Sequence, residues 1–233
     1  MTAEQPVTVI TGTRKGIGKF LAQHYVEKGH LVVGCSRGEI DWSLENYEHV
    51  QLDVGDEDAV RELFRQLRSR GRLDNLINNA GTAYLNHSLL TPASAMSKTF
   101  TTNVLGSFLC CREAARLMKK RRYGRIVNFT SSAVPLKLDG ETAYAASKAG
   151  IVMMTEVLAR ELAPLGITVN AIGPGVVSTD LIRGLPEETL QRVLASHAIP
   201  RLAMLEEIAN VVDFLVAPES GIVTGQAIYL GGP

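Results

Sequence analysis

The chain alternates short, nearly unbroken apolar runs with longer stretches in which apolar residues recur every three or four positions. Unbroken apolar runs are typical of strands buried on both faces of a parallel sheet, and the longer stretches have the spacing of amphipathic helices. We therefore predict an α/β Rossmann fold, with a doubly wound, seven-stranded parallel sheet and helices on both faces. The predicted strands span residues 7–10, 31–35, 49–52, 75–78, 125–129, 168–172 and 227–230.

Glycine and proline mark the ends of two predicted helices. Gly29 should close the first helix, because glycine readily adopts the left-handed conformation found at helix ends. The helix that begins near residue 142 should end close to Pro164 and Gly166. No repeat or linker interrupts the pattern, so we expect one domain over residues 1–233. Residues 180–204 follow a strand directly and resemble short amphipathic helices, which predicts a lid over a substrate.

Composition excludes several classes of partner. Hydrophobic residues make up 45% of the 233 positions, and 24 Lys and Arg balance 24 Asp and Glu, which argues against nucleic acid and membrane surfaces. No signal peptide and no apolar run of about 18 residues is present, so we expect a cytoplasmic protein. Cys35, Cys110 and Cys111 fit neither a disulfide framework nor a metal motif, and we expect them to be buried. The histidines show no ligand spacing, so we predict no metal site.

A glycine-rich segment, TGTRKGIG, lies between the first predicted strand and the first helix. Gly12, Gly16 and Gly18 allow the backbone to approach a pyrophosphate at the positive end of the helix. A tight turn without a ligand is the plainer alternative. A phosphate loop for nucleoside triphosphates is excluded, because Thr13 and Phe20 occupy positions where that motif requires glycine and Ser or Thr.

The end of the second predicted strand bears on the choice between NAD and NADP. Ser36 stands where an acidic residue would bind the ribose 2′-hydroxyl of NAD, and Arg37 follows it. Arg14 and Lys15 add two cations from the glycine loop. These residues favour NADP(H), whereas Glu39, two residues beyond Arg37, keeps NAD(H) open.

Tyr144 and Lys148 lie four residues apart in a helical stretch, so their side chains should be neighbours on one face. Taken alone, the pair could be a packed tyrosine beside a solvated lysine. Together with TGTRKGIG, NNAG at 78–81, Asn103 and PGVVST at 174–179, however, YAASK resembles the short-chain dehydrogenase/reductases in order and spacing, over essentially the whole chain. GRIVNFTSS, ELAPLGITVNAIGPG and VTGQAIYL most resemble the 3-oxoacyl-[acyl-carrier-protein] reductase type.

The resemblance implies the catalytic roles. Tyr144 would be the general acid in reduction and the general base in oxidation, and Lys148 would bind the ribose hydroxyls and lower the pKa of the tyrosine. The catalytic serine of the family precedes the tyrosine by thirteen positions, which selects Ser131 over Ser132. Asn103 would hold a water molecule in a proton relay.

Electrostatics support the role implied for Lys148. A free phenol has a pKa of about 10, so proton exchange near neutral pH needs a decrease of roughly 3 units, or about 4 kcal/mol. One cation at about 4 Å, in an effective dielectric constant of about 20, supplies about 4 kcal/mol. A hydrogen bond from Ser131 would stabilise charge on the substrate oxygen during hydride transfer.

The resemblance also extends the cofactor site. Asp53 would contact the adenine, although it could equally cap a strand end, residues 79–81 would pack against the adenosine, and residues 174–179 would bracket the nicotinamide. The predicted cofactor contacts are Gly12, Arg14, Lys15, Gly16, Ile17, Gly18, Ser36, Arg37, Asp53, Val54, Asn79, Ala80, Gly81, Tyr144, Lys148, Pro174, Gly175, Val177 and Thr179.

The sequence says less about the substrate. Val134 and Leu136 follow Ser131, and the expected lid carries Leu181, Ile182 and Leu185, which suits a moderately apolar ketone or acyl chain. An acyl carrier protein is acidic and would need cations near the mouth of the site. The cluster at residues 119–122, made of Lys119, Lys120, Arg121 and Arg122, is a candidate, but Leu165 replaces a second basic position of the carrier-protein reductases.

The leading hypothesis is an NADPH-dependent carbonyl reductase acting on a 3-oxoacyl thioester or a similar ketone. A dehydrogenase or reductase of a specialised metabolite is the alternative within the enzymes, and an NADP(H)-sensing binding protein is the alternative outside them. The epimerase and dehydratase branch of the fold is disfavoured, because its members have longer chains and a different glycine pattern. The resemblance further implies a homotetramer or homodimer.

Overall fold

The computed structural model describes residues 5–178 and 187–233. Seven parallel strands form one sheet in the order β3-β2-β1-β4-β5-β6-β7. The predicted fold class and all seven predicted strands are confirmed, with ends that differ by one or two residues where they differ at all. The strands are β1 (Val7–Thr11), β2 (Leu31–Ser36), β3 (Tyr47–Gln51), β4 (Asn75–Asn78), β5 (Gly124–Phe129), β6 (Ile167–Gly173) and β7 (Ala227–Tyr229).

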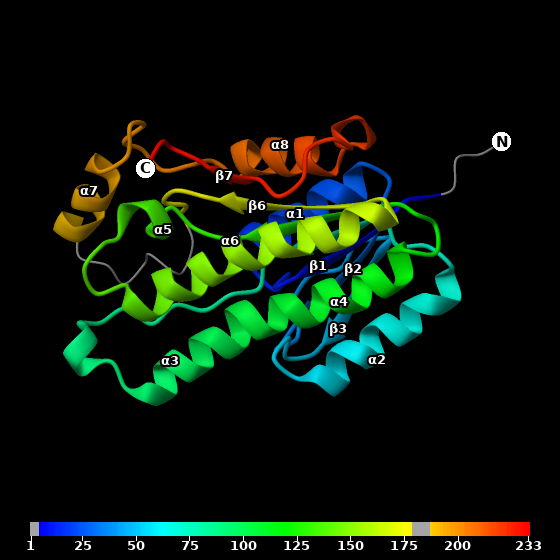
Figure 1. Cartoon of the computed structure of the whole chain (residues 1–233), viewed down its shortest axis with the longest axis horizontal. Coiled ribbons are helices and arrows are strands. Elements are labelled where there is room, and N and C mark those ends of the chain that lie inside the picture. The colour runs from blue at the N-terminus through cyan, green and yellow to red at the C-terminus, as the bar shows by residue number, and fades with distance from the viewer. Residues whose placement is uncertain (1–4, 179–186) are drawn as a thin grey trace.

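Helices cover both faces of the sheet (Figure 1). α1 (Gly16–Glu27) and α8 (Leu205–Val216) pack on one face, and α2 (Glu57–Leu67), α4 (Gly106–Met118) and α6 (Thr142–Leu162) pack on the other. α3 (Ala93–Phe100) continues through a π-turn, Thr101–Leu105, into α4. The short α5 (Ala133–Leu136) and α7 (Glu187–Ala195) lie near the carboxyl ends of the strands. No helix in the described ranges is long and apolar enough to cross a bilayer.

One connection differs from the predicted alternation of strands and helices. Residues 37–46 join β2 to β3 without a helix. A parallel pair needs a crossover, and this one runs as a loop past Trp42, whose ring packs against Tyr47 of β3 with centroids 4.3 Å apart. The segment contains Gly38, Asp41, Ser43 and Asn46, residue types that do not favour the interior of a helix.

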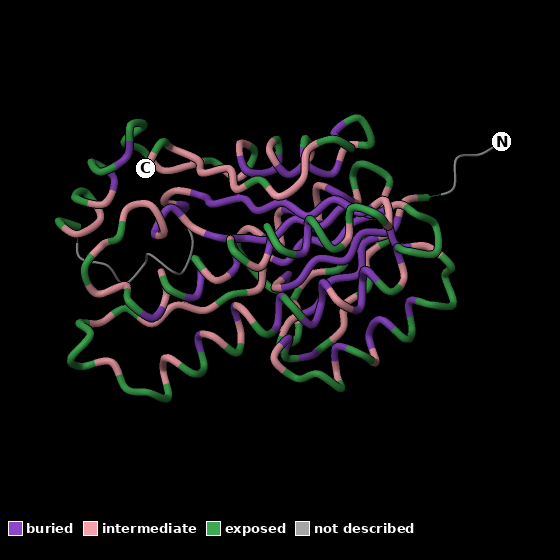
Figure 2. Tube along the Cα trace, in the orientation of Figure 1, coloured by how far each residue is buried: buried purple, intermediate pink, exposed green. Residues whose placement is uncertain are grey.

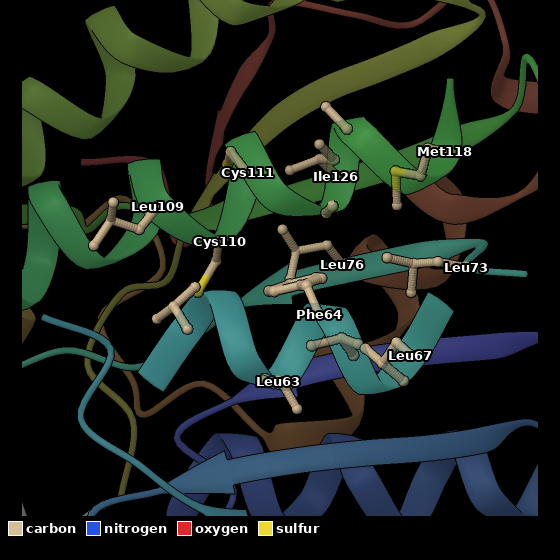
Figure 3. Close-up of a cluster of buried hydrophobic side chains, with 14 of the residues drawn as sticks. Leu63, Phe64, Leu67, Leu73, Leu76, Leu109, Cys110, Cys111, Met118 and Ile126 are labelled. Carbon is tan, nitrogen blue, oxygen red and sulfur yellow. The ribbon is translucent and has the colours of Figure 1, made fainter. Parts of the chain in front are cut away.

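The core follows from helical periodicity (Figure 3). Val60, Leu63, Phe64 and Leu67 recur on one face of α2 and are nearly fully buried against α4 and the sheet. Burial of such a side chain contributes about 1.5–3 kcal/mol. Cys110 and Cys111 of α4 lie in the same cluster, which confirms the expectation that they are buried. Figure 2 shows the central strands buried and the outer surfaces of the helices exposed.

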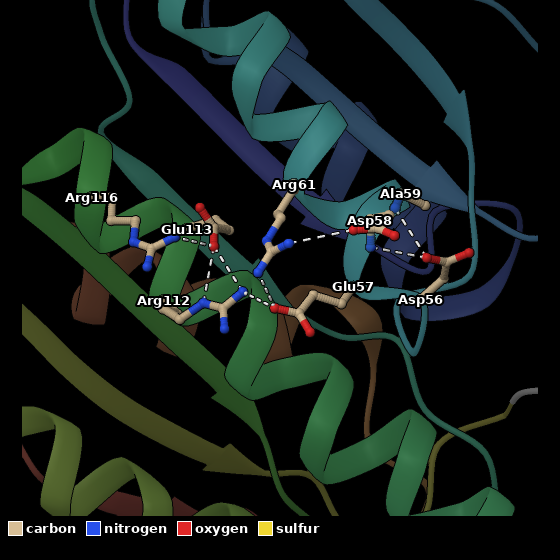
Figure 4. Close-up of polar contacts among 8 residues, drawn as sticks. All are labelled: Asp56, Glu57, Asp58, Ala59, Arg61, Arg112, Glu113 and Arg116. Atoms are coloured by element: carbon tan, nitrogen blue, oxygen red, sulfur yellow. Dashed lines mark hydrogen bonds and ion pairs between the residues drawn. The ribbon is translucent and has the colours of Figure 1, made fainter.

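Polar contacts fix how α2 meets α4 (Figure 4). The carboxylate of Asp56 caps α2 by accepting hydrogen bonds from the backbone N–H groups of residues 58 and 59, at 3.0 and 3.1 Å. Arg112 of α4 bonds Glu57 of α2 at 2.9 Å and also contacts the buried Glu113. Exposed ion pairs contribute only about 0–1 kcal/mol to the free energy of folding. These contacts therefore orient α2 and α4 more than they stabilise the packing between them.

The predicted helix ends are confirmed. α1 ends at Glu27, and Gly29 has a φ of 82°. α6 ends at Leu162 and passes through a 3-10 turn to Gly166, with a φ of 75°. A side chain at Gly166 would also place its Cβ against the carbonyl oxygen of Arg122, so only glycine fits there.

Candidate active site

A cavity of about 1120 Å³ opens at the carboxyl ends of the strands, where the strand order reverses between β1 and β4. This is the place where open α/β sheets bind ligands. It brings together most of the predicted site: Gly12, Arg14, Lys15, Gly16, Ile17, Ser36, Arg37, Asp53, Val54, Asn79, Ala80, Gly81, Ser131, Tyr144, Lys148, Pro174, Gly175 and Val177.

Three predicted residues are not among those that line the cavity. Gly18 packs beneath the glycine loop, and Asn103 is fully buried behind the cavity wall. Thr179 lies outside the described residues, as do Leu181, Ile182 and Leu185 of the expected lid. The described part of that segment does reach the site, because Leu190 and Val193 of α7 line the cavity. Of the two apolar residues after Ser131, Leu136 lines it and Val134 does not.

The glycine loop is shaped by close packing. Gly12 has a φ of 78°, and a Cβ there would lie 2.9 Å from the Cα of Ala80. A Cβ at Gly18 would lie 2.3 Å from the carbonyl oxygen of Gly12. The amide of Asn79 donates to the carbonyl oxygens of Thr11 and Gly12, at 2.9 and 3.2 Å, and holds the turn. The amino end of α1 therefore faces the cavity, where its free N–H groups suit a pyrophosphate.

Cations gather at the far end of this groove, after β2. The guanidinium of Arg14 lies over Gly38, within 3.2 Å of where a Cβ would be, and Arg37 lines the same part of the cavity. Within the described residues neither arginine is paired with a carboxylate. Glu39, the residue that left NAD(H) as a possible cofactor, is exposed and does not line the cavity. This end of the site is built for an anion.

A hydrogen-bond network that the sequence did not reveal supports this end from behind. The hydroxyl of Tyr47 donates to Oγ1 of Thr13 at 2.8 Å and lies 2.9 Å from Nδ1 of His49. Nε2 of His49 lies 3.0 Å from Oγ of Ser36, which donates to the carbonyl oxygen of Gly38 at 2.8 Å. β3 thereby holds Ser36, which lines the cavity beside Arg37.

Asp53 caps a turn and also lines the cavity, and its predicted contact with the adenine stays a prediction. Its Oδ1 accepts a hydrogen bond from the N–H of Gly55 at 2.9 Å, so it caps the turn after β3. It is exposed and lines the cavity as well, beside Val54.

Ser131 and Tyr144 meet at the other end of the cavity. Both line the cavity, and the hydroxyl of Ser131 acts on the pKa of Tyr144, which favours Ser131 over the adjacent Ser132. Burial raises the pKa of Tyr144, the hydroxyl of Ser131 opposes that effect, and the negative charge of Glu141 raises the pKa further. Oγ of Ser131 also accepts from the N–H of Ala133 at 3.2 Å, so the start of α5 orients it.

Lys148 is buried one turn further along α6, with 4% of its surface exposed. Its Nζ donates to the carbonyl oxygen of Phe129 at 2.7 Å and lies 5.7 Å from the centroid of the Tyr144 ring. Burial lowers the pKa of Lys148 to about 8. Desolvation raises the pKa of Tyr144, and the ammonium of Lys148 is directed at a backbone carbonyl. That Lys148 lowers the pKa of the tyrosine stays a prediction.

Asn103 lies in the π-turn between α3 and α4, a type of distortion common at functional sites. Its amide donates to the carbonyl oxygen of Thr82 and to Oγ of Ser147, both at 2.9 Å, and its Oδ1 accepts from the N–H of Thr82 at 2.8 Å. The side chain thus ties the segment after β4 to α6. Its predicted part in a proton relay stays a prediction.

The basic cluster at residues 119–122 does not lie at the mouth of the cavity. It follows α4 and directly precedes β5, and Arg121 bonds Asp74, the residue before β4, at 3.3 Å. The cluster is therefore at the amino ends of the parallel strands, whereas the cavity is at their carboxyl ends. The expectation that these cations surround the entrance is wrong for a single chain.

Comparison with known proteins gives the family. The family model described as Enoyl-(Acyl carrier protein) reductase matches residues 12–232. The 3-oxoacyl-[acyl-carrier-protein] reductase FabG of Vibrio cholerae is 32% identical over 239 residues, covering 100% of this chain and 98% of the relative. The chain belongs to the short-chain dehydrogenase/reductase family.

Solved members of the short-chain dehydrogenase/reductase family superpose closely. A putative gluconate dehydrogenase from Agrobacterium tumefaciens has a TM-score of 0.90 at 30% identity, covering 97% of this chain and 94% of the other. A variant of actinorhodin polyketide ketoreductase with NADPH has a TM-score of 0.89 at 29% identity, covering 99% and 97%. Membership identifies the chain as an NAD(P)-dependent oxidoreductase and accounts for the cavity that the motifs surround.

Proposed function

We propose that the protein is an NADPH-dependent carbonyl reductase that transfers a hydride to a ketone while Tyr144 donates a proton to the carbonyl oxygen. The hydroxyl residues Ser131 and Tyr144 carry this proposal, because both line one end of the cavity whose other end suits a phosphorylated dinucleotide. Two convergent hydroxyls are the donors that a developing alkoxide requires.

The proposed cofactor is NADP(H). Arg14 and Arg37 both line the cavity near the end of β2, where the one carboxylate among the described lining residues is that of Asp53, which caps its own turn. A guanidinium suits a 2′-phosphate, whereas NAD sites use an acidic residue after the second strand. The NADPH in the matching ketoreductase structure agrees with this choice.

When bound, the dinucleotide would supply the hydride, and the chain would supply the rest. The glycine loop and the amino end of α1 would hold the pyrophosphate, and Lys148 would reach the nicotinamide ribose beside Tyr144. Burial lowers the pKa of Lys148 to about 8, so the lysine is still mainly charged at neutral pH and can stabilise the tyrosinate that remains after proton donation.

A 3-oxoacyl thioester remains the first candidate substrate, because the FabG relative is named for that reaction. A specialised small ketone is the second candidate, and the position of the 119–122 cluster favours it. Those cations lie at the opposite end of the strands from the cavity, so within one chain they cannot meet a carrier protein that delivers its substrate to Tyr144.

The proposal predicts that NADPH oxidation depends on both a ketone and Tyr144. An acetoacetyl thioester, an aliphatic diketone and a bicyclic ketone form a suitable panel, tested with NADPH and with NADH. Tyr144→Phe should bind NADPH and lose about 10²- to 10⁴-fold in rate, the usual contribution of a positioned acid. Undiminished turnover in that variant would exclude the proposed mechanism, and NADPH binding without turnover of any ketone would favour a sensor.

The predicted homotetramer or homodimer is part of the proposal. α4 and α6 carry exposed apolar side chains that a second copy would cover, among them Phe108, Met153 and Val157. Light scattering with size-exclusion chromatography tests this, and a monomer at micromolar concentration would contradict it.

A further inference from the structure

The substrate end of the cavity contains a carboxyl group that hydride transfer does not use. Glu141 precedes α6 by one position and Tyr144 by three, so one helical turn places the two side chains on the same side. Both line the cavity, as does Ser131. The charge of Glu141 also raises the pKa of Tyr144.

Glu141 has none of the partners that ordinarily explain a glutamate at the start of a helix. It occupies the N-cap position of α6, yet its side chain makes no capping hydrogen bond. Its Oε2 is buried and lacks a hydrogen-bond partner among the described residues. Burial raises the pKa of the carboxyl, as expected for a group withdrawn from water without a cation beside it.

The surrounding polar groups are already engaged. Lys148 directs its ammonium to the carbonyl oxygen of Phe129, and Oγ of Ser131 accepts a hydrogen bond from the N–H of Ala133. The other side chains around this end of the cavity include the apolar Leu136 and Leu138. A buried oxygen without a partner is unfavourable, so a ligand that supplies a donor there is favoured over one that does not.

We propose that Glu141 is a substrate-recognition residue that accepts a hydrogen bond from an uncharged donor, a hydroxyl or an amide N–H, carried by the substrate beside the carbonyl that is reduced. This rests on the proposed carbonyl reduction. The substrate class is then a ketone with a neighbouring donor. An alkyl ketone would leave Oε2 unpartnered, and a ketone bearing a carboxylate would meet a like charge.

The test compares ketones that differ only in the donor. The first pair is hydroxyacetone and 2-butanone, in which a methyl group replaces the hydroxyl. The second pair, 4-hydroxy-2-butanone and 2-pentanone, makes the same replacement one carbon further from the carbonyl. kcat/KM is measured with NADPH for the wild-type chain, Glu141→Gln, Glu141→Leu and the control Glu161→Leu, which alters an exposed glutamate on the same helix. The thermal midpoint and NADPH affinity of each variant establish that it is folded.

We expect the wild-type chain to prefer at least one hydroxylated ketone over its matched partner by about tenfold or more, since a site built for a hydroxyl discriminates strongly against its absence. Glu141→Leu should bring that ratio close to one, while Glu141→Gln, whose amide oxygen still accepts, and Glu161→Leu should keep it. Equal ratios in the wild-type chain and Glu141→Leu would overturn the assignment and leave carbonyl reduction standing. Absence of turnover for every ketone, with NADPH bound, would instead overturn the proposed function and this assignment with it.

Discussion

Lys148 should destabilise the folded chain at neutral pH, and Lys148→Met should remove that cost. The lysine is 4% exposed, and burial lowers its pKa from 10.5 to about 8. Because the folded-state value is the lower one, the unfolded chain binds more protons between these pH values. The free energy of unfolding must therefore rise with pH through the window from about 8 to about 10.5.

The size of the effect follows from the same interval. The penalty below pH 8 is about 3 kcal/mol, and about 2 kcal/mol of it should disappear between pH 7 and pH 9.5. Lys148→Met also removes the 2.7 Å hydrogen bond to the carbonyl oxygen of Phe129, which offsets part of the gain in the free energy of unfolding at any one pH. The change with pH is therefore the decisive quantity, because the lost hydrogen bond is common to both ends of the range.

Urea unfolding, followed by the fluorescence of Trp42, measures this at about pH 7 and about pH 9.5. The wild-type chain should gain roughly 2 kcal/mol relative to Lys148→Met over that range. Lys120→Met, at an exposed lysine, serves as the control and should follow the wild-type curve. If the free energies of unfolding of the wild-type chain and Lys148→Met change equally between the two pH values, burial of Lys148 does not destabilise the folded chain.

Three further changes test other parts of the site. Gly18→Ala should weaken NADPH binding by at least tenfold in a fluorescence titration, because its Cβ would lie 2.3 Å from the carbonyl oxygen of Gly12; unchanged affinity would contradict the packing. Arg37→Ala should lower NADPH affinity about tenfold or more without changing that for NADH, and equal losses would place Arg37 away from the 2′-phosphate. Glu141→Gln removes a charge that raises the pKa of Tyr144, so the rise of alcohol oxidation with pH should move to lower pH; an unmoved profile would mean that the two groups do not interact.

Much of the fold could be predicted because its signals are local. Short runs rich in Val, Ile and Leu, each interrupted by a few polar residues, identified β1 and β4–β6, and Gly29 and Gly166 marked helix ends through their left-handed conformation. The π-turn at Thr101–Leu105 could not be predicted, since it depends on Asn103 bonding Thr82 and Ser147, which are distant in sequence. The loop between β2 and β3 was not predicted, because a helix was expected between every two strands although the composition of this segment favours a turn.

The site could be predicted where motif residues lie on the backbone that builds the cavity. The glycine loop, Ser131 and Tyr144 are of this kind. Burial and pairing could not be read from the sequence, which is why the pKa of Tyr144 and the role of Glu141 emerged only from the structure. The position of the basic cluster could have been predicted from the sequence, because residues that directly precede a parallel strand lie at its amino end, away from the ligand.

The most direct test of carbonyl reduction is the fate of the hydride. NADPH deuterated at the transferred position is incubated with acetoacetyl and crotonyl thioesters together, and the products are analysed by mass spectrometry and NMR. We expect one deuterium on the carbinol carbon of a 3-hydroxy thioester, formed about 10²- to 10⁴-fold more slowly by Tyr144→Phe. Deuterium on a saturated carbon derived from the crotonyl thioester would show carbon–carbon double-bond reduction and would contradict carbonyl reduction.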